Sequence, residues 1–89
     1  MLEIADIKTI FENGEIEKAD ELLDSFEGEK NVNYWLLKGG ISQKKQLWGQ
    51  AINAFQKVLE IDAGNKEADS SVEIINNILN FSNPEMFNV

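Results

Sequence analysis

The sequence predicts a small all-α domain, and three observations support this. Apolar residues recur every three or four positions along five segments, which is the period of an amphipathic helix. No segment alternates apolar and polar residues over a length that would indicate a strand. The chain has 89 residues, enough for a single domain with a core that forms without disulfides or metals.

The first two segments predict a helical hairpin. Residues 2–11 carry an apolar stripe, and Asn13–Gly14 ends this helix, because glycine adopts the left-handed conformation of a helix C-terminus without steric cost. A second stripe begins near Ile16 and is expected to close at Gly28. Two helices joined by so short a break must lie antiparallel.

The same pattern returns further along the chain. Helices are expected at about 32–45 and 48–61, followed by a turn at Asp62–Asn65. A fifth amphipathic helix is expected at about 66–81, and it ends before Pro84, which moves the preceding residue out of the helical region.

The tail of residues 82–89 carries apolar side chains beyond that last helix. We expect Met86 and Phe87 to fold back onto the helical core. The alternative is that the tail occupies a binding groove of its own or of another copy.

The two hairpins repeat one another. Gly14 and Ala19 in the first hairpin lie 32 residues before Gln46 and Ala51 in the second. A repeat of this length indicates stacked pairs of helices, because one pair cannot bury its apolar face alone.

The second hairpin resembles the tetratricopeptide repeat, whose pattern W-x₂-L-G-x₂-Y…A-x₃-F…P extends over about 34 residues. The residues that match this pattern in identity and spacing are Trp35, Gly39, Ala51 and Phe55. The residues that depart from it are Lys38, Ser42 and Ala63. In the first hairpin Gly14 and Ala19 fit, but Glu3 stands in place of the tryptophan, so this copy is divergent.

The resemblance implies a right-handed superhelical stack of two antiparallel hairpins with a fifth helix as a cap. The expected units are repeat 1 at about residues 2–30, repeat 2 at about 32–65, the capping helix at about 66–81 and the tail at 82–89. Packing roles are implied for Gly14, Ala19, Trp35, Gly39, Ala51 and Phe55. The small Gly39 and Ala51 let the helices of one hairpin approach. The aromatic Trp35 and Phe55 are expected to fill the space between hairpins.

The resemblance also implies a function, because in this family the first helix of each hairpin lines a concave groove that binds a peptide or a protein segment. Carried over by position, the groove residues are Ile4, Lys8, Phe11, Glu12, Asn33, Leu36, Leu37, Gly40, Gln43 and Lys44. On the capping helix Ser70, Ile74 and Asn77 would extend the groove. A non-catalytic protein-binding module is the function this predicts, as a monomer more than a dimer. The alternative is a self-associating structural unit with no separate ligand.

The charge pattern excludes some partners and suggests others. A net charge of -8 argues against nucleic acid and anionic membrane surfaces, because both would repel the chain. Residues 32–59 carry lysines and no acids, whereas the segments on either side are acidic. We interpret this as attraction between neighbouring helices. The alternative is a basic strip that meets an acidic partner segment.

The sequence offers little for catalysis. The chain has no cysteine and no histidine, which removes thiolate nucleophiles, imidazole bases and the usual zinc ligands. The carboxylate pair Asp20 and Asp24, one helical turn apart, is typical of a solvated helix surface. We therefore expect no enzyme, cofactor or metal. The longest apolar run, Tyr34–Leu37, and the acids near the N-terminus favour a cytoplasmic protein without a membrane anchor.

Overall fold

A computed structural model describes the backbone of residues 2–82 and the side chains of residues 2–80, and this part of the chain is all-helical. The helices are α1 (Ile4–Glu12), α2 (Ile16–Asp24), α3 (Val32–Lys44), α4 (Trp48–Ile61) and α5 (Lys66–Ser82). The predicted all-α class is confirmed. The expectations for Pro84, Met86 and Phe87 fall outside the described residues.

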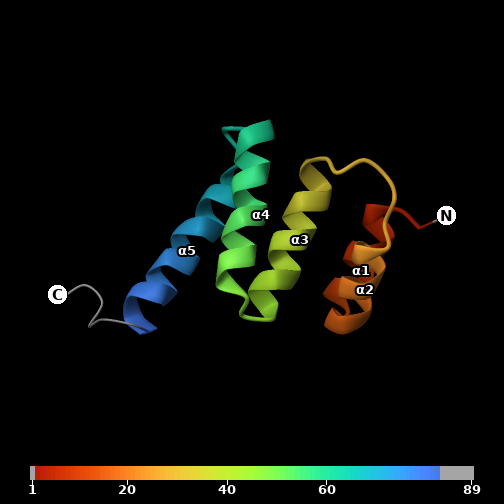
Figure 1. Cartoon of the computed structure of the whole chain (residues 1–89), viewed down its shortest axis with the longest axis horizontal. Helices are drawn as coiled ribbons and strands as arrows, with labels where there is room; N and C mark the ends of the chain where they lie inside the picture. The colour runs from red at the N-terminus through yellow and green to blue at the C-terminus, as the bar shows by residue number, and fades with distance from the viewer. Residues whose placement is uncertain (1, 83–89) are drawn as a thin grey trace.

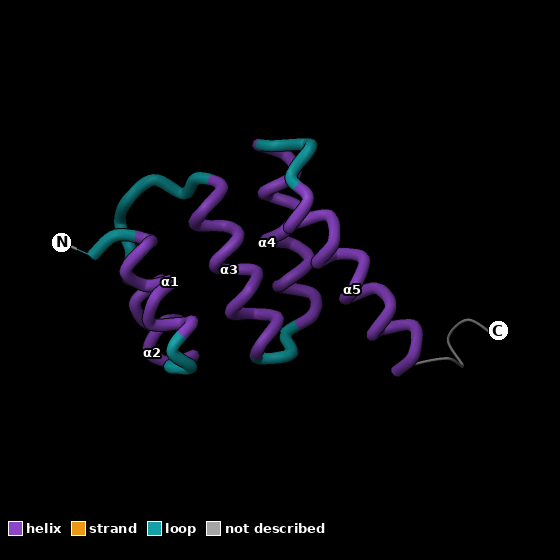
Figure 2. The backbone as a smooth tube through the Cα atoms, turned by 180° about the vertical axis from the view of Figure 1, so that it is seen from behind, coloured by secondary structure: helices purple, strands orange, loops and turns teal. Residues whose placement is uncertain are grey.

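The helices stand next to one another in a row, with α3 at its centre (Figure 1). The pair α1–α2 lies on one side of α3, and α4 and α5 follow on the other, as the view from behind also shows (Figure 2). Helix α3 contacts every other helix, whereas α2 and α4 do not contact each other within the described part of the chain. The segment that best matches a repeat pattern is therefore also the centre of the packing.

The two turns that join α1 to α2 and α3 to α4 have the same backbone conformation. Gly14 has a φ of 91° and Gln46, 32 positions later, has a φ of 62°, so both are left-handed. The first turn has N–H to C=O hydrogen bonds from Asn13 to Thr9, Gly14 to Phe11 and Glu15 to Ile10. The second has them from Lys45 to Ile41, Gln46 to Gln43 and Leu47 to Ser42. At these two turns the sequence repeat is thus also a repeat of the backbone conformation.

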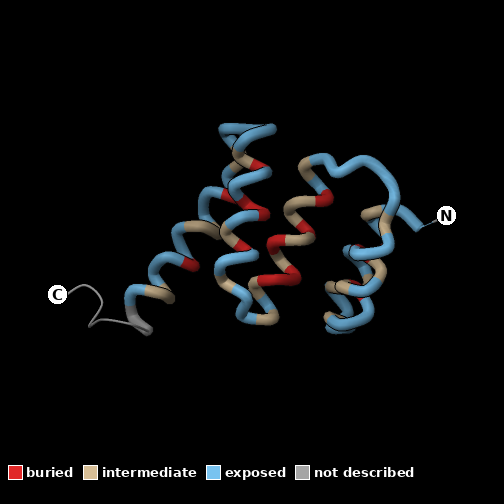
Figure 3. The backbone as a smooth tube through the Cα atoms, viewed as in Figure 1, coloured by how far each residue is buried: buried red, intermediate tan, exposed pale blue. Residues whose placement is uncertain are grey.

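Two groups of buried side chains form the core, and buried segments gather along α3 and α4 in the middle of the row (Figure 3). The first group lies among α1, α2 and α3 and consists of Ile7, Ala19, Leu23, Tyr34, Leu37 and Ile41. The second lies mainly between α4 and α5 and consists of Ala51, Phe55, Val58, Ala68 and Ile75. Trp35 is half-buried and packs against both groups, so it connects them.

Helix α2 ends earlier than its pattern predicts. It stops at Asp24, with Ser25 as the C-cap, and Gly28 lies in the loop that follows. The closing role expected for Gly28 is therefore wrong. Just beyond the end of the helix, the ring of Phe26 stacks on that of Tyr34, with 6.1 Å between the ring centroids.

Asparagine caps begin two of the helices. The Asn31 side chain accepts a hydrogen bond from the Tyr34 N–H at 3.1 Å, and the Asn65 side chain accepts one from the Ala68 N–H at 2.9 Å. Such caps satisfy a backbone donor that has no partner inside the helix. They fix the starts of α3 and α5.

Candidate functional site

A groove of about 920 Å³ lies over α3, between α1 on one side and the start of α5 on the other. We call it the main groove. Its lining residues are Ile4, Ala5, Lys8, Phe11, Glu12, Asn33, Leu36, Leu37, Gly40, Gln43, Lys44, Gln46, Trp48, Phe55, Glu67 and Ser71. Every groove residue predicted on the first helix of each hairpin is among them. The structure therefore brings these positions, which come from two distant segments, to one surface.

The capping helix contributes different residues from those predicted. Ser70, Ile74 and Asn77 do not line the main groove, whereas Glu67 and Ser71 do. The difference is a rotation of the helix by one position. The burial of Ala68 and Ile75 against α4 determines which face of α5 is turned toward the core. The apolar pattern of the sequence defines that face only to within one residue. Ile74 lies on the helical stripe that continues from Glu67 and Ser71, and it is 50% exposed.

The walls of the main groove are apolar where α1 meets α3. A Cβ placed on Gly40 would lie 3.5 Å from the Phe11 ring, so the ring rests on α3 at a position that has no side chain. Leu36 is half-buried and packs against the second core group. Leu37 also borders the groove, but it is only 5% exposed and belongs mainly to the core. Of these two leucines, Leu36 is the one that a ligand would contact.

Polar and charged side chains border the apolar surface. Asn33, Gln43 and Gln46 offer side-chain amides, which both donate and accept hydrogen bonds. Lys8 and Lys44 are balanced by Glu12 and Glu67, so the groove carries no net charge although the chain is strongly acidic. The ion pairs found among residues 2–80 involve none of these four charged side chains.

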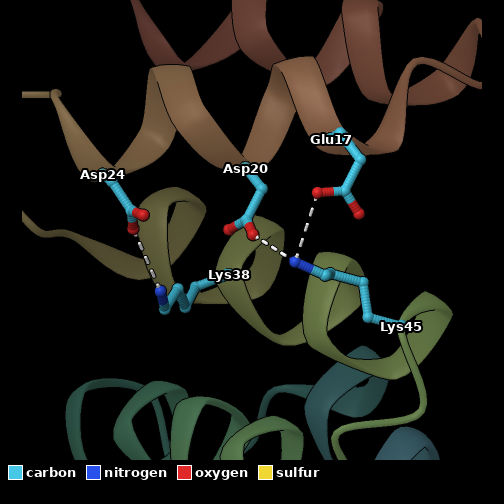
Figure 4. A network of polar contacts seen from close by, with 5 residues as sticks. All are labelled: Glu17, Asp20, Asp24, Lys38 and Lys45. Carbon is cyan, nitrogen blue, oxygen red and sulfur yellow. Dashed lines mark hydrogen bonds and ion pairs between the residues drawn. The ribbon is translucent and has the colours of Figure 1, made fainter.

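Two other lysines, Lys38 in α3 and Lys45 at its C-cap, do not line the main groove and instead point toward acidic side chains of α2 (Figure 4). The Lys45 Nζ lies 2.7 Å from the Asp20 carboxylate and 3.6 Å from that of Glu17. The Lys38 Nζ lies 3.5 Å from the Asp24 carboxylate. These contacts agree with our interpretation that the basic middle of the chain attracts its acidic neighbour. They also place Asp20 and Asp24, the carboxylate pair considered for catalysis, in ion pairs between helices.

The contact between Lys45 and Asp20 raises the pKa of the lysine. The hydrogen bond to Asp20 raises the pKa of Lys45 above its ordinary value of 10.5, and the nearby negative charges of Asp20 and Glu17 act in the same direction. Partial burial opposes the shift, with an effect smaller than that of the hydrogen bond to Asp20 but larger than that of either nearby charge. Lys45 is therefore held in its charged form.

Some residues of the main groove do not follow from sequence reasoning. Trp48 and Phe55 enter it from α4, which the repeat pattern treats as the outer helix of its hairpin. Gln46 enters it because its left-handed backbone turns the chain at the end of α3. The alignment of Gln46 with Gly14 is the signal that could have indicated this turn.

No described helix combines the length and the apolar character needed to cross a membrane. Among the same residues, no cluster of acidic side chains has the size and arrangement of a metal site. Comparison of the chain with protein-family models, with curated proteins and with solved structures finds no match.

Proposed function

We propose that this chain is a short tetratricopeptide-like module that binds an extended segment of another protein in the main groove, without catalysis. One observation carries the proposal. The positions on α1 and α3 that the family resemblance assigns to ligand contact line, in this chain, a single groove with an apolar wall and polar borders. Its volume is within the range of about 300–1,000 Å³ that is usual for ligand sites.

The contacts between helices support the superhelical stack that this proposal needs. Helix α1 contacts α3, and α3 contacts α5, so the first helices of successive units adjoin one another. The described parts of α2 and α4 remain separate on the other side. Successive units that touch more closely on one side than on the other produce a curved array with a concave inner surface.

The chemistry of the main groove favours a peptide in an extended conformation. The amides of Asn33 and Gln43 can pair with the N–H and C=O groups that an extended chain leaves free. Leu36 and Phe11 provide an apolar surface for one or two side chains of the segment. Lys44 and Glu67 would orient a segment that carries charges of both signs.

Self-association is the second candidate, and Ile74 is the observation that favours it. This side chain is 50% exposed on α5, just beyond the main groove. Light scattering over a concentration series separates the two candidates. A dimer that persists at low micromolar concentration would favour self-association, whereas a monomer would favour the binding module.

The proposal is tested by selecting binding peptides from a random library and measuring their affinity for two double variants. Leu36→Asp with Lys44→Glu changes the main groove, and we expect it to weaken binding at least tenfold, about 1.4 kcal/mol. Leu47→Asp with Lys18→Glu makes the same exchanges outside the groove and should leave the affinity unchanged. Circular dichroism checks that both variants fold. Equal affinity for both variants would show that the groove is not the binding site.

A further inference from the structure

A second cleft lies at the N-terminal end of α1. We call it the N-terminal cleft, and its volume is about 750 Å³. It is formed by the start of α1, the end of α2 and the loop of residues 25–31. The apolar residues that line it are Leu2, Ile4, Ala5, Ile7, Leu22 and Phe26. Ile7 is fully buried at its base, and Leu2 is 44% exposed at its border.

The loop between α2 and α3 creates this cleft. The turns after α1 and α3 are tight and closed by the same hydrogen bonds, but the chain from Ser25 to Asn31 takes a longer path. The Phe26 ring lies against the backbone at Gly28, where any side chain would collide with it. The loop therefore folds closely over Phe26 and leaves a hollow between itself and α1.

Among residues 2–80, the charged side chains that line the N-terminal cleft are all of one sign. Glu3, Glu27 and Glu29 line it, all three are exposed, and no lysine lines it. The nearest lysine in the sequence, Lys30, has its ammonium 5.5 Å from the centre of the Tyr34 ring instead. The ion pairs found among residues 2–80 involve none of the three glutamates.

The glutamates of the N-terminal cleft differ in this respect from the acids of α2. Glu17, Asp20 and Asp24 already pair with lysines of the neighbouring helix. Glu3 is the N-cap residue of α1, in a capping box with Asp6, whereas Glu27 and Glu29 form no ion pair with residues 2–80. Both border an apolar hollow that is large enough for a side chain. These glutamates would attract a cation, and the attraction would be strongest at low ionic strength.

We infer that the N-terminal cleft binds a basic partner segment through one apolar side chain with lysine or arginine on either side. The apolar side chain would be buried against Phe26 and Leu22, and the flanking cations would face Glu27 and Glu29. The inference does not depend on the main groove holding a peptide. The two sites are nevertheless continuous, because Ile4, Ala5 and Asn33 line both.

The test uses capped pentapeptides of defined sequence and isotope-labelled full-length protein, followed by nuclear magnetic resonance. The probe has a central leucine between two lysines and a glycine at each end. We expect it to shift the backbone amide signals of Phe26, Gly28 and Glu29 and to leave those of Gln43 and Lys44 unchanged. Peptides with glutamates in place of the lysines, or serine in place of the leucine, should bind at least about fivefold more weakly.

Two double variants separate a local effect from that of net charge. Glu27→Lys with Glu29→Lys should weaken the binding of the lysine peptide by about fivefold or more, because the two lysines of the peptide lose their carboxylate partners. Glu21→Lys with Glu73→Lys makes the same change of net charge at exposed helix positions outside both sites, and it should retain the affinity within about twofold. Equal losses in both variants, equal binding of the lysine and glutamate peptides, or shifts confined to the main groove would each overturn the inference.

Discussion

The ring of Phe55 fills the space that a side chain at position 39 would need. A Cβ on Gly39 would lie 2.7 Å from two carbons of that ring, which is closer than real contacts allow. Phe55 itself is 2% exposed and belongs to the second core group. The ring thus lies between the two helices of one hairpin, not only between hairpins as the family pattern implies. Because Gly39 has no side chain, the Phe55 ring can pack directly against α3 at this residue.

Replacing Gly39 therefore should destabilise the fold. We expect Gly39→Ala to lower the free energy of unfolding by about 1–3 kcal/mol, although alanine favours helices more than glycine does. The next residue provides a matched control. Gly40→Ala would place its Cβ at an ordinary 3.5 Å from the Phe11 ring, so it should gain roughly 0.5–1 kcal/mol. Urea denaturation measures both, and similar stabilities for the two variants would refute this account of the α3–α4 contact.

The two left-handed turns predict opposite effects for opposite substitutions. A Cβ at Gly14 would meet nothing within 4 Å, so Gly14→Ala should cost only the strain of its backbone, roughly 1 kcal/mol. Gln46 already bears that strain, and Gln46→Gly should recover a similar amount, about 1 kcal/mol. Thermal unfolding of both variants checks the signs. A loss of stability in Gln46→Gly would mean that its side chain matters more than its backbone.

The raised pKa of Lys45 predicts that the stability of the fold decreases at alkaline pH. A lysine whose pKa is higher in the folded chain contributes stability that is complete below its unfolded pKa and is lost as the pH rises through the folded pKa. For Lys45 the contribution is present at neutral pH and disappears above pH 10.5. In denaturant titrations, Lys45→Gln should lose less stability than wild type over this range. Lys45→Arg should keep its ion pairs, because arginine stays protonated.

Lys18 supplies the control for that experiment. It is exposed, and the ion pairs found among residues 2–80 do not include it. Lys18→Gln should follow the wild-type pH profile. If Lys45→Gln followed it too, the contact between Lys45 and Asp20 would not contribute to folding.

The sequence predicts most of this fold because its helices have strong apolar periods and clear ends. The bounds of α4 agree with the structure at both ends, and Asn13 and Gly14 end α1 as expected. The end of α2 could not be predicted in the same way. Phe26 continues the apolar stripe of α2 in the sequence, but it lies beyond the C-cap, where its ring stacks on Tyr34 of another helix. The pattern of α2 alone does not indicate such a contact.

The same distinction applies to the candidate site. Positions on α1 and α3 could be identified because the repeat pattern fixes which side of those helices faces the core. Helix α5 lies beyond the matched repeat, so its rotation depends on how Ala68 and Ile75 pack against α4. The N-terminal cleft was not predicted at all, since it arises from the path of a loop that has no periodic pattern.

The most direct test of the proposed function is to locate a bound peptide on the labelled protein by nuclear magnetic resonance. A peptide selected for binding should shift the backbone amide signals of Leu36, Gly40 and Gln43 most, and these shifts should vanish in the Leu36→Asp and Lys44→Glu double variant. Shifts centred on the α2 surface around Glu17 and Glu21, unchanged in that variant, would contradict binding in the main groove.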